Sequence, residues 1–146
     1  MLTAAVAQER ERMLGVWKLE AFEVEFQDTG ERQSPFGVHP HGYIIFTAEG
    51  RMMALLTAEG RPTPHTDAER AAAFRSMYAY SGTYRLEGDR WLTQVDKAWN
   101  EAWTGTEQLR FYRFAGEKLV VTTPWGTPVG FGDRQTRGIL TWVKEK

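Results

Sequence analysis

About eight short runs of the chain alternate apolar and polar residues, and turn residues such as Asp28-Thr29-Gly30 and Glu49-Gly50 separate them. A period of two is typical of strands that bury one face, and Gly-containing turns are typical of antiparallel hairpins. The runs span residues 17–27, 42–48, 51–57, 80–86, 91–98, 106–114, 118–123 and 136–143. Short strands at this spacing favour an up-and-down barrel over a sandwich. We therefore predict an all-β fold, an eight-stranded up-and-down antiparallel barrel.

Two helical segments flank or interrupt the strand pattern. Residues 4–14 are rich in Ala, Glu, Arg, Met and Leu, and Gly15 follows them as a C-cap. Between the third and fourth strands, Thr66 and Glu69 match a capping box, and an alanine-rich helix continues to Met77. We expect the first, short helix to plug one end of the barrel and the second to cover its mouth.

Composition narrows the classes of partner. With 146 residues, 42% of them hydrophobic, the chain fits a single domain over residues 1–146. Its net charge of -1 and the absence of a basic stripe predict no nucleic-acid or membrane partner. No cysteine is present, so a disulfide is excluded, and we expect neither a metal nor a cofactor. The first residues lack the apolar core of a signal peptide, which predicts a cytoplasmic protein, and we expect a monomer or homodimer.

Gly15-Val16-Trp17 leads from the first helix directly into the first strand. A tryptophan at that position is expected to form the floor of the barrel, and small closed barrels of eight strands can hold one small ligand. The alternation along the first strand changes parity near Ala21, which predicts a β-bulge.

Four ordered motifs extend over nearly the whole chain: Gly15-Val-Trp-Lys-Leu, Gly42-Tyr-Ile-Ile-Phe-Thr-Ala-Glu-Gly-Arg-Met, Tyr80-Ser-Gly-Thr-Tyr and Trp103-Thr-Gly-Thr-Glu-Gln-Leu-Arg-Phe. The chain resembles the bacterial lipocalin-like domain family of the calycin superfamily. The resemblance implies a lipocalin-like barrel with a central cavity and a floor made by Trp17 with the guanidinium of Arg137. Related barrels include carriers and cofactor-free enzymes, so the resemblance does not choose between these functions.

Polar candidates lie on two neighbouring strands. Alternation places Gln108, Arg110 and Tyr112 on one face of the run 106–114, while Gln94 and Asp96 share a face of the preceding run. An Asp96–Arg110 pair across the two strands has two interpretations. It points inward and orients a polar ligand group, or it is an ordinary ion pair on the outside of the barrel.

Further candidates complete the predicted site. The ligand-binding set comprises Tyr43, Met52, Tyr84, Gln94, Trp103, Gln108, Arg110 and Tyr112, whose aromatic and thioether members suit an apolar ligand. His41, at a strand entrance, is a candidate for moving a proton near neutral pH. Structural packing and a surface location are the competing interpretations for these residues.

Three functions remain open from the sequence. The first is binding of a small, largely apolar or amphipathic molecule in the central cavity, oriented by a few polar side chains. The second is a cofactor-free isomerase, cyclase or lyase, with Asp96 or His41 as general base and Arg110 stabilising negative charge. The third is a barrel filled by its own side chains that serves as a protein-interaction domain. The volume of the cavity separates the third from the first two.

Overall fold

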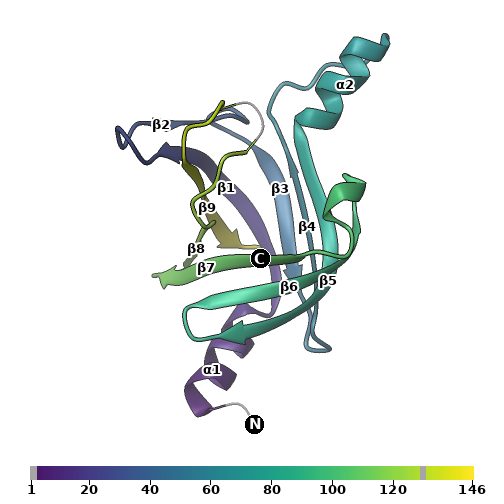
Figure 1. The fold of residues 1–146 in the computed structure, drawn as a ribbon. Coiled ribbons are helices and arrows are strands. Elements are labelled where there is room, and N and C mark those ends of the chain that lie inside the picture. The colour runs from purple at the N-terminus through teal and green to yellow at the C-terminus, as the bar shows by residue number, and fades with distance from the viewer. Residues whose placement is uncertain (1–2, 129–130) are drawn as a thin grey trace.

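The computed structural model describes residues 3–128 and 131–146, and in this part the chain forms one closed antiparallel barrel (Figure 1). The strand order is β2-β1-β3-β4-β5-β6-β7-β8-β9, and β1 also pairs with β9, which closes the sheet. The strands are β1 Gly15–Phe26, β2 Arg32–Gln33, β3 His41–Phe46, β4 Arg51–Thr57, β5 Met77–Glu87, β6 Arg90–Ala98, β7 Glu107–Ala115, β8 Lys118–Thr122 and β9 Thr136–Lys144. The predicted eight-stranded barrel is confirmed, and the two-residue β2 is an additional strand beside the end of β1.

The first strand closes the barrel because it is long and bulged. Residues Gly15–Lys18 of β1 pair with β3, while β9 pairs with β1 along most of its length. The register of the β1–β9 pair shifts between Leu19 and Ala21, so the predicted bulge is confirmed. A bulge increases local twist, which lets one strand bend between two neighbours.

Helix α1 (Ala4–Met13) lies at one end of the barrel, as predicted for a plug (Figure 1). Met13 is fully buried beneath the strands. Arg10 donates to the carbonyl oxygen of Ala48 at 2.8 Å and Arg12 to that of Gly116 at 2.6 Å, so α1 is bonded to the turns of the β3–β4 and β7–β8 hairpins. This end of the barrel is therefore closed.

A further hydrogen bond joins α1 to the barrel. The buried Tyr112 hydroxyl donates to Glu9 Oε2 at 2.7 Å. We expect Tyr112→Phe to lower the free energy of unfolding by about 1.5–3 kcal/mol, the range for a hydrogen bond to a charged group. Burial and the Glu9 carboxylate raise the pKa of Tyr112 above its ordinary value. The contribution is thus fully present below about pH 10, where the unfolded phenol begins to ionise, and is lost as the pH rises further. Urea denaturation of both proteins from neutral pH upward checks this; a difference between them that stays constant above pH 10 would contradict it.

Helix α2 (Asp67–Arg75) begins with the predicted capping box, in which Thr66 and Glu69 bond reciprocally. It has no buried residue and projects beyond the strands at the open end (Figure 1). The expectation that it covers the mouth is wrong, because its alanine-rich face has too little apolar surface to hold it across the opening. Its C-terminal turn touches the rim, where Trp99 Nε1 donates to the carbonyl oxygen of Phe74 at 3.2 Å. In the described residues, no helix is long and apolar enough to cross a membrane.

Trp17 is buried at the closed end, and its indole Nε1 donates to the carbonyl oxygen of Met13 at 2.8 Å. The expected partner, Arg137, is elsewhere: its guanidinium lies 4.5 Å from the ring centre of Trp125. The cation over the Trp17 ring is the ammonium of Lys144, at 4.5 Å. The antiparallel register between β1 and β9 is the reason, since it places Lys144 opposite Trp17 and Arg137 opposite Glu25.

The interior of the closed end is filled by side chains. Phe46 packs edge-to-face against Trp91 with ring centres 5.3 Å apart, and Trp91 lies 6.0 Å from Tyr112. Met52 and Leu119 are completely buried in the same core. The barrel therefore resembles a filled core at the α1 end, and any space for a ligand lies toward the other end.

Candidate functional site

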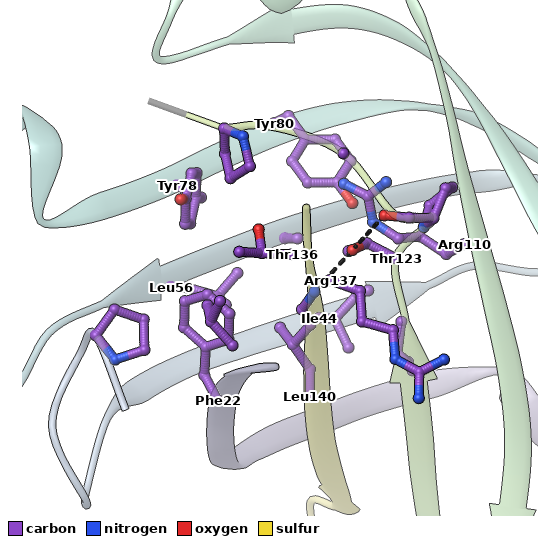
Figure 2. Close-up of a pocket in the computed structure, with 18 of the residues that line it drawn as sticks. Phe22, Ile44, Leu56, Tyr78, Tyr80, Arg110, Thr123, Thr136, Arg137 and Leu140 are labelled. Carbon is purple, nitrogen blue, oxygen red and sulfur yellow. Dashed lines mark hydrogen bonds between the residues drawn. The ribbon is translucent and has the colours of Figure 1, made fainter. Parts of the chain in front are cut away.

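A cavity of about 420 Å³ occupies the interior toward the open end of the barrel (Figure 2). This volume is within the range of small-molecule sites, about 300–1,000 Å³. Most of the wall is apolar, and its side chains come from strands around the barrel: Phe22, Val24, Ile44, Ala54, Leu56, Tyr78, Tyr80, Trp91, Val121, Leu140 and Trp142. Trp91 belongs both to this wall and to the filled core, so it separates the two regions.

The strand register explains why these residues face the cavity. Ile44 of β3 lies directly opposite Ala54 of β4, and Ala54 lies opposite Tyr80 of β5. Residues directly opposite each other share a face of the sheet. Because the middle residue of this row is an alanine, the row leaves interior space that a larger side chain would occupy.

Arg110 brings a positive charge to the cavity wall. Alternation along β7 places it on the same face as the buried Tyr112, and it lies opposite Trp91. Its Nη1 donates to the carbonyl oxygen of Leu109 at 2.8 Å, and its guanidinium carbon lies 6.0 Å from the ring centre of Trp103. Among the described residues, Arg110 forms no ion pair.

Trp103, in the 3-10 helix η1 (Glu101–Trp103), is the centre of an aromatic group on the wall. It stacks on Tyr78 with ring centres 6.0 Å apart, and the ring centre of Tyr80 is 5.3 Å away. Burial raises the pKa of the Tyr78 hydroxyl, and the positive charge of Arg110 offsets part of that rise. Tyr78 therefore remains a neutral hydrogen-bond donor beside the guanidinium at physiological pH.

Asp96 lies on the outer face of the barrel, so the predicted Asp96–Arg110 pair does not form. Its carboxylate accepts from Arg51 Nη1 at 2.7 Å and from Ser81 Oγ at 2.8 Å, which lowers the pKa of Asp96. The register between β6 and β7 provides the reason: Trp91 lies opposite Arg110 and Thr93 opposite Gln108, so Gln94 and Asp96 share the outer face of β6. Alternation along one strand does not say which of its faces meets the inward face of the next strand, because that depends on the register between them.

The other predicted site residues divide into three groups. Trp103 and Arg110 line the cavity. Met52, Tyr84 and Tyr112 point inward but are buried in the core below it, where the Tyr84 hydroxyl donates to the carbonyl oxygen of Thr47 at 3.1 Å. Gln108 is half-buried and does not line the cavity, and Tyr43, Gln94 and His41 are exposed on the outside. Tyr43 and Gln94 face outward because the residues beside them, Ile44 and Thr93, take the inward positions.

Several lining residues were not predicted. Phe22, Ile44, Leu56 and Leu140 lie on strands that the sequence identifies, and alternation marks the inward face of β3 and β4. Nothing in that pattern says which end of the barrel is hollow. Tyr78 was missed because β5 begins at Met77, immediately after α2, three residues before the predicted strand.

The charged residues among the described residues that line the cavity are all positive. Arg110 and Arg137 are the two arginines among these residues, and no aspartate, glutamate or histidine is among them. Arg137 is balanced by Glu25, whose Oε1 lies 2.8 Å from Arg137 Nη2. The described residues also contain no group of three or more His, Cys, Asp or Glu side chains able to hold a metal ion.

A family model for the lipocalin-like domain matches residues 14–145, which is the barrel from β1 through β9. The chain belongs to the lipocalin-like domain family. The barrel of this family indicates small-molecule binding in general. No functionally curated protein matches the chain.

Two solved structures are similar to this lipocalin-like domain at low sequence identity. A lipocalin-like protein from Bacteroides uniformis is 14% identical with a TM-score of 0.49, and the match covers 92% of this chain and 99% of that one. An uncharacterized protein from Bacteroides eggerthii is 16% identical with a TM-score of 0.45, over 88% of this chain and 98% of that one.

Proposed function

We propose that the protein binds one small, largely apolar molecule in the cavity, and that Arg110 orients its polar end. The observation that carries this proposal is a cavity of about 420 Å³ with an aromatic and aliphatic wall and a guanidinium beside Trp103. Burial of apolar surface supplies the affinity, at roughly 25 cal/mol per Å² before the cost of immobilising the ligand. A few polar groups in an otherwise apolar cavity are typical of sites that select a ligand by orientation.

The positions of charged residues favour binding over proton-transfer catalysis. Both candidate general bases, Asp96 and His41, lie on the outer surface. Among the described residues that line the cavity, there is no carboxylate or imidazole to take a proton from a bound molecule. The third candidate function, a filled barrel that serves as a protein-interaction domain, is also disfavoured, because side chains fill the interior only at the closed end.

A cavity-filling substitution tests the proposal. Ala54 is 2% exposed and faces the cavity, whereas its neighbour Met53 is 54% exposed on the outer face. We expect wild-type protein to bind N-phenylnaphthylamine, a neutral apolar fluorophore, and Ala54→Trp to weaken that binding at least tenfold by occupying the space. Fluorescence titration measures the affinity, with Met53→Trp as the control on the same strand and thermal unfolding to verify that both variants fold.

Native mass spectrometry before and after organic extraction provides an independent check. A co-purified small molecule that Ala54→Trp fails to retain supports the proposal. Wild-type protein that carries nothing and binds no N-phenylnaphthylamine would contradict it.

A further inference from the structure

Arg110 has unused hydrogen-bonding capacity inside the barrel. A guanidinium has five N–H donors in a planar fork. Among the described residues this side chain bonds to the carbonyl oxygen of Leu109 alone, from Nη1 at 2.8 Å. The other cavity arginine is different, because Arg137 pairs with Glu25 at 2.8 Å and stacks on Trp125. Of the two arginines among the described lining residues, Arg110 is the one without a counter-charge.

Two phenol hydroxyls beside Arg110 also lack a protein partner. Other inward tyrosines donate to the protein, as Tyr84 does to Thr47 and Tyr112 to Glu9. Tyr78 and Tyr80 both line the cavity and both pack on Trp103, but neither hydroxyl hydrogen-bonds to another described residue. Tyr80 is 8% exposed, but its hydroxyl is not one of the described side-chain atoms that are buried without a partner, so it stays accessible to an acceptor in the cavity.

We infer that the ligand is a planar monocarboxylic acid, whose carboxylate pairs with the guanidinium of Arg110 and accepts from the hydroxyls of Tyr78 and Tyr80. The inference rests on the proposed function and names its ligand class. The planar fork of an arginine matches the two oxygens of a carboxylate, and charge-assisted bonds of this kind are about twice as strong as neutral ones. The flat body of the acid lies along the aromatic group around Trp103, which offers ring faces for stacking.

The residues that line the cavity determine which charge the ligand carries. A cationic ligand would meet a guanidinium and no carboxylate among the described lining residues, so it would be desolvated without compensation. A neutral ligand of the same shape would leave Arg110 without a counter-charge. A carboxylate satisfies both the charge and the unpaired donors.

The test compares naphthoate, naphthamide and naphthylmethylammonium, which share one flat ring system and differ in charge. We expect naphthoate to bind wild-type protein about 10- to 100-fold more tightly than naphthamide, the range for a hydrogen bond to a charged partner, and the ammonium to bind worst. Arg110→Met should abolish the preference for naphthoate over naphthamide. Arg113→Met, an exposed arginine on the outer face of the same strand, should retain it. Isothermal titration calorimetry near neutral pH measures all three ligands, and urea denaturation verifies that the variants fold.

The outcomes separate the inference from the proposed function. Equal affinities for naphthoate and naphthamide in wild-type protein would overturn the acid assignment, while N-phenylnaphthylamine binding would still support a cavity for apolar molecules. A preference for naphthoate that survives in Arg110→Met would also overturn it. If no naphthalene derivative and no N-phenylnaphthylamine binds, both the inference and the proposed function fail.

Discussion

Replacement of Trp17 by alanine is expected to lower the free energy of unfolding by about 3–5 kcal/mol, the range for removing a large buried aromatic side chain. The side chain is 3% exposed and lies 6.3 Å from Phe114, ring centre to ring centre. Its indole also bonds to the carbonyl oxygen of Met13 and lies under the ammonium of Lys144. The substitution therefore removes core packing, the hydrogen bond from Trp17 to α1 and the contact between Trp17 and Lys144 of β9.

Urea denaturation followed by circular dichroism measures this loss without relying on tryptophan fluorescence. The control is Trp125→Ala, since Trp125 is 36% exposed at the opposite end and should cost less than about 1 kcal/mol. If Trp17→Ala does not fold, Trp17→Phe isolates the indole hydrogen bond and should cost about 1–2 kcal/mol. A loss below about 1 kcal/mol for Trp17→Ala would show that the floor of the barrel does not depend on this side chain.

Alanine at position 82 is expected to destabilise the barrel by about 3 kcal/mol, at the upper end of the usual cost of overpacking. Gly82 sits in β5 at the bulge, where a β-carbon would lie 2.0 Å from the carbonyl oxygen of Gln94 and 2.8 Å from its carbonyl carbon. Both atoms belong to the backbone of β6, so a side-chain rotation cannot relieve the contact. With alanine at this position, β5 and β6 must move apart, which weakens the pairing between them.

Gly126→Ala is the matched control for this prediction. A β-carbon at position 126 would meet no atom within 4 Å, and its backbone is not in the left-handed region. We expect its thermal midpoint to stay within about 2 °C of wild type, because a change of 1 kcal/mol shifts the midpoint of a domain of this size by about 2–8 °C. Equal midpoints for Gly82→Ala and wild type would mean that β5 and β6 separate easily, and that the close approach is not required by the fold.

The sequence left open whether Asp96 faces the cavity beside Arg110, and in the structure it does not. Alternation correctly grouped Arg110 with Tyr112 on one face of β7, because that strand is regular between its neighbours, and only the structure shows that this face is the inward one. On β6 it also grouped Gln94 with Asp96 correctly, but that face is the outer one, where Asp96 binds Arg51 and Ser81. Which face of β6 meets the inward face of β7 depends on the register between the two strands, and that register places Trp91 rather than Asp96 beside Arg110.

The floor pair failed for a related reason. A tryptophan near the start of the chain and a cation on the last strand were both expected, and both exist. Which cation meets Trp17 depends on the register between β1 and β9, strands that are more than 100 residues apart in the sequence. That register selects Lys144 and leaves Arg137 to pair with Glu25 near the open end.

The amino-acid sequence by itself determined the class of the fold, the two helices, the bulge in β1 and the placement of Arg110 on the same strand face as Tyr112. Each of these follows from a local pattern: period-two alternation, a capping box, a change of parity and the spacing of turns. Only the tertiary structure decided that the closed end is filled, that the cavity lies around Trp103, and that Arg110 has no counter-charge there among the described residues. Those properties depend on which distant side chains share one interior, and closure of β1 onto β9 sets that arrangement.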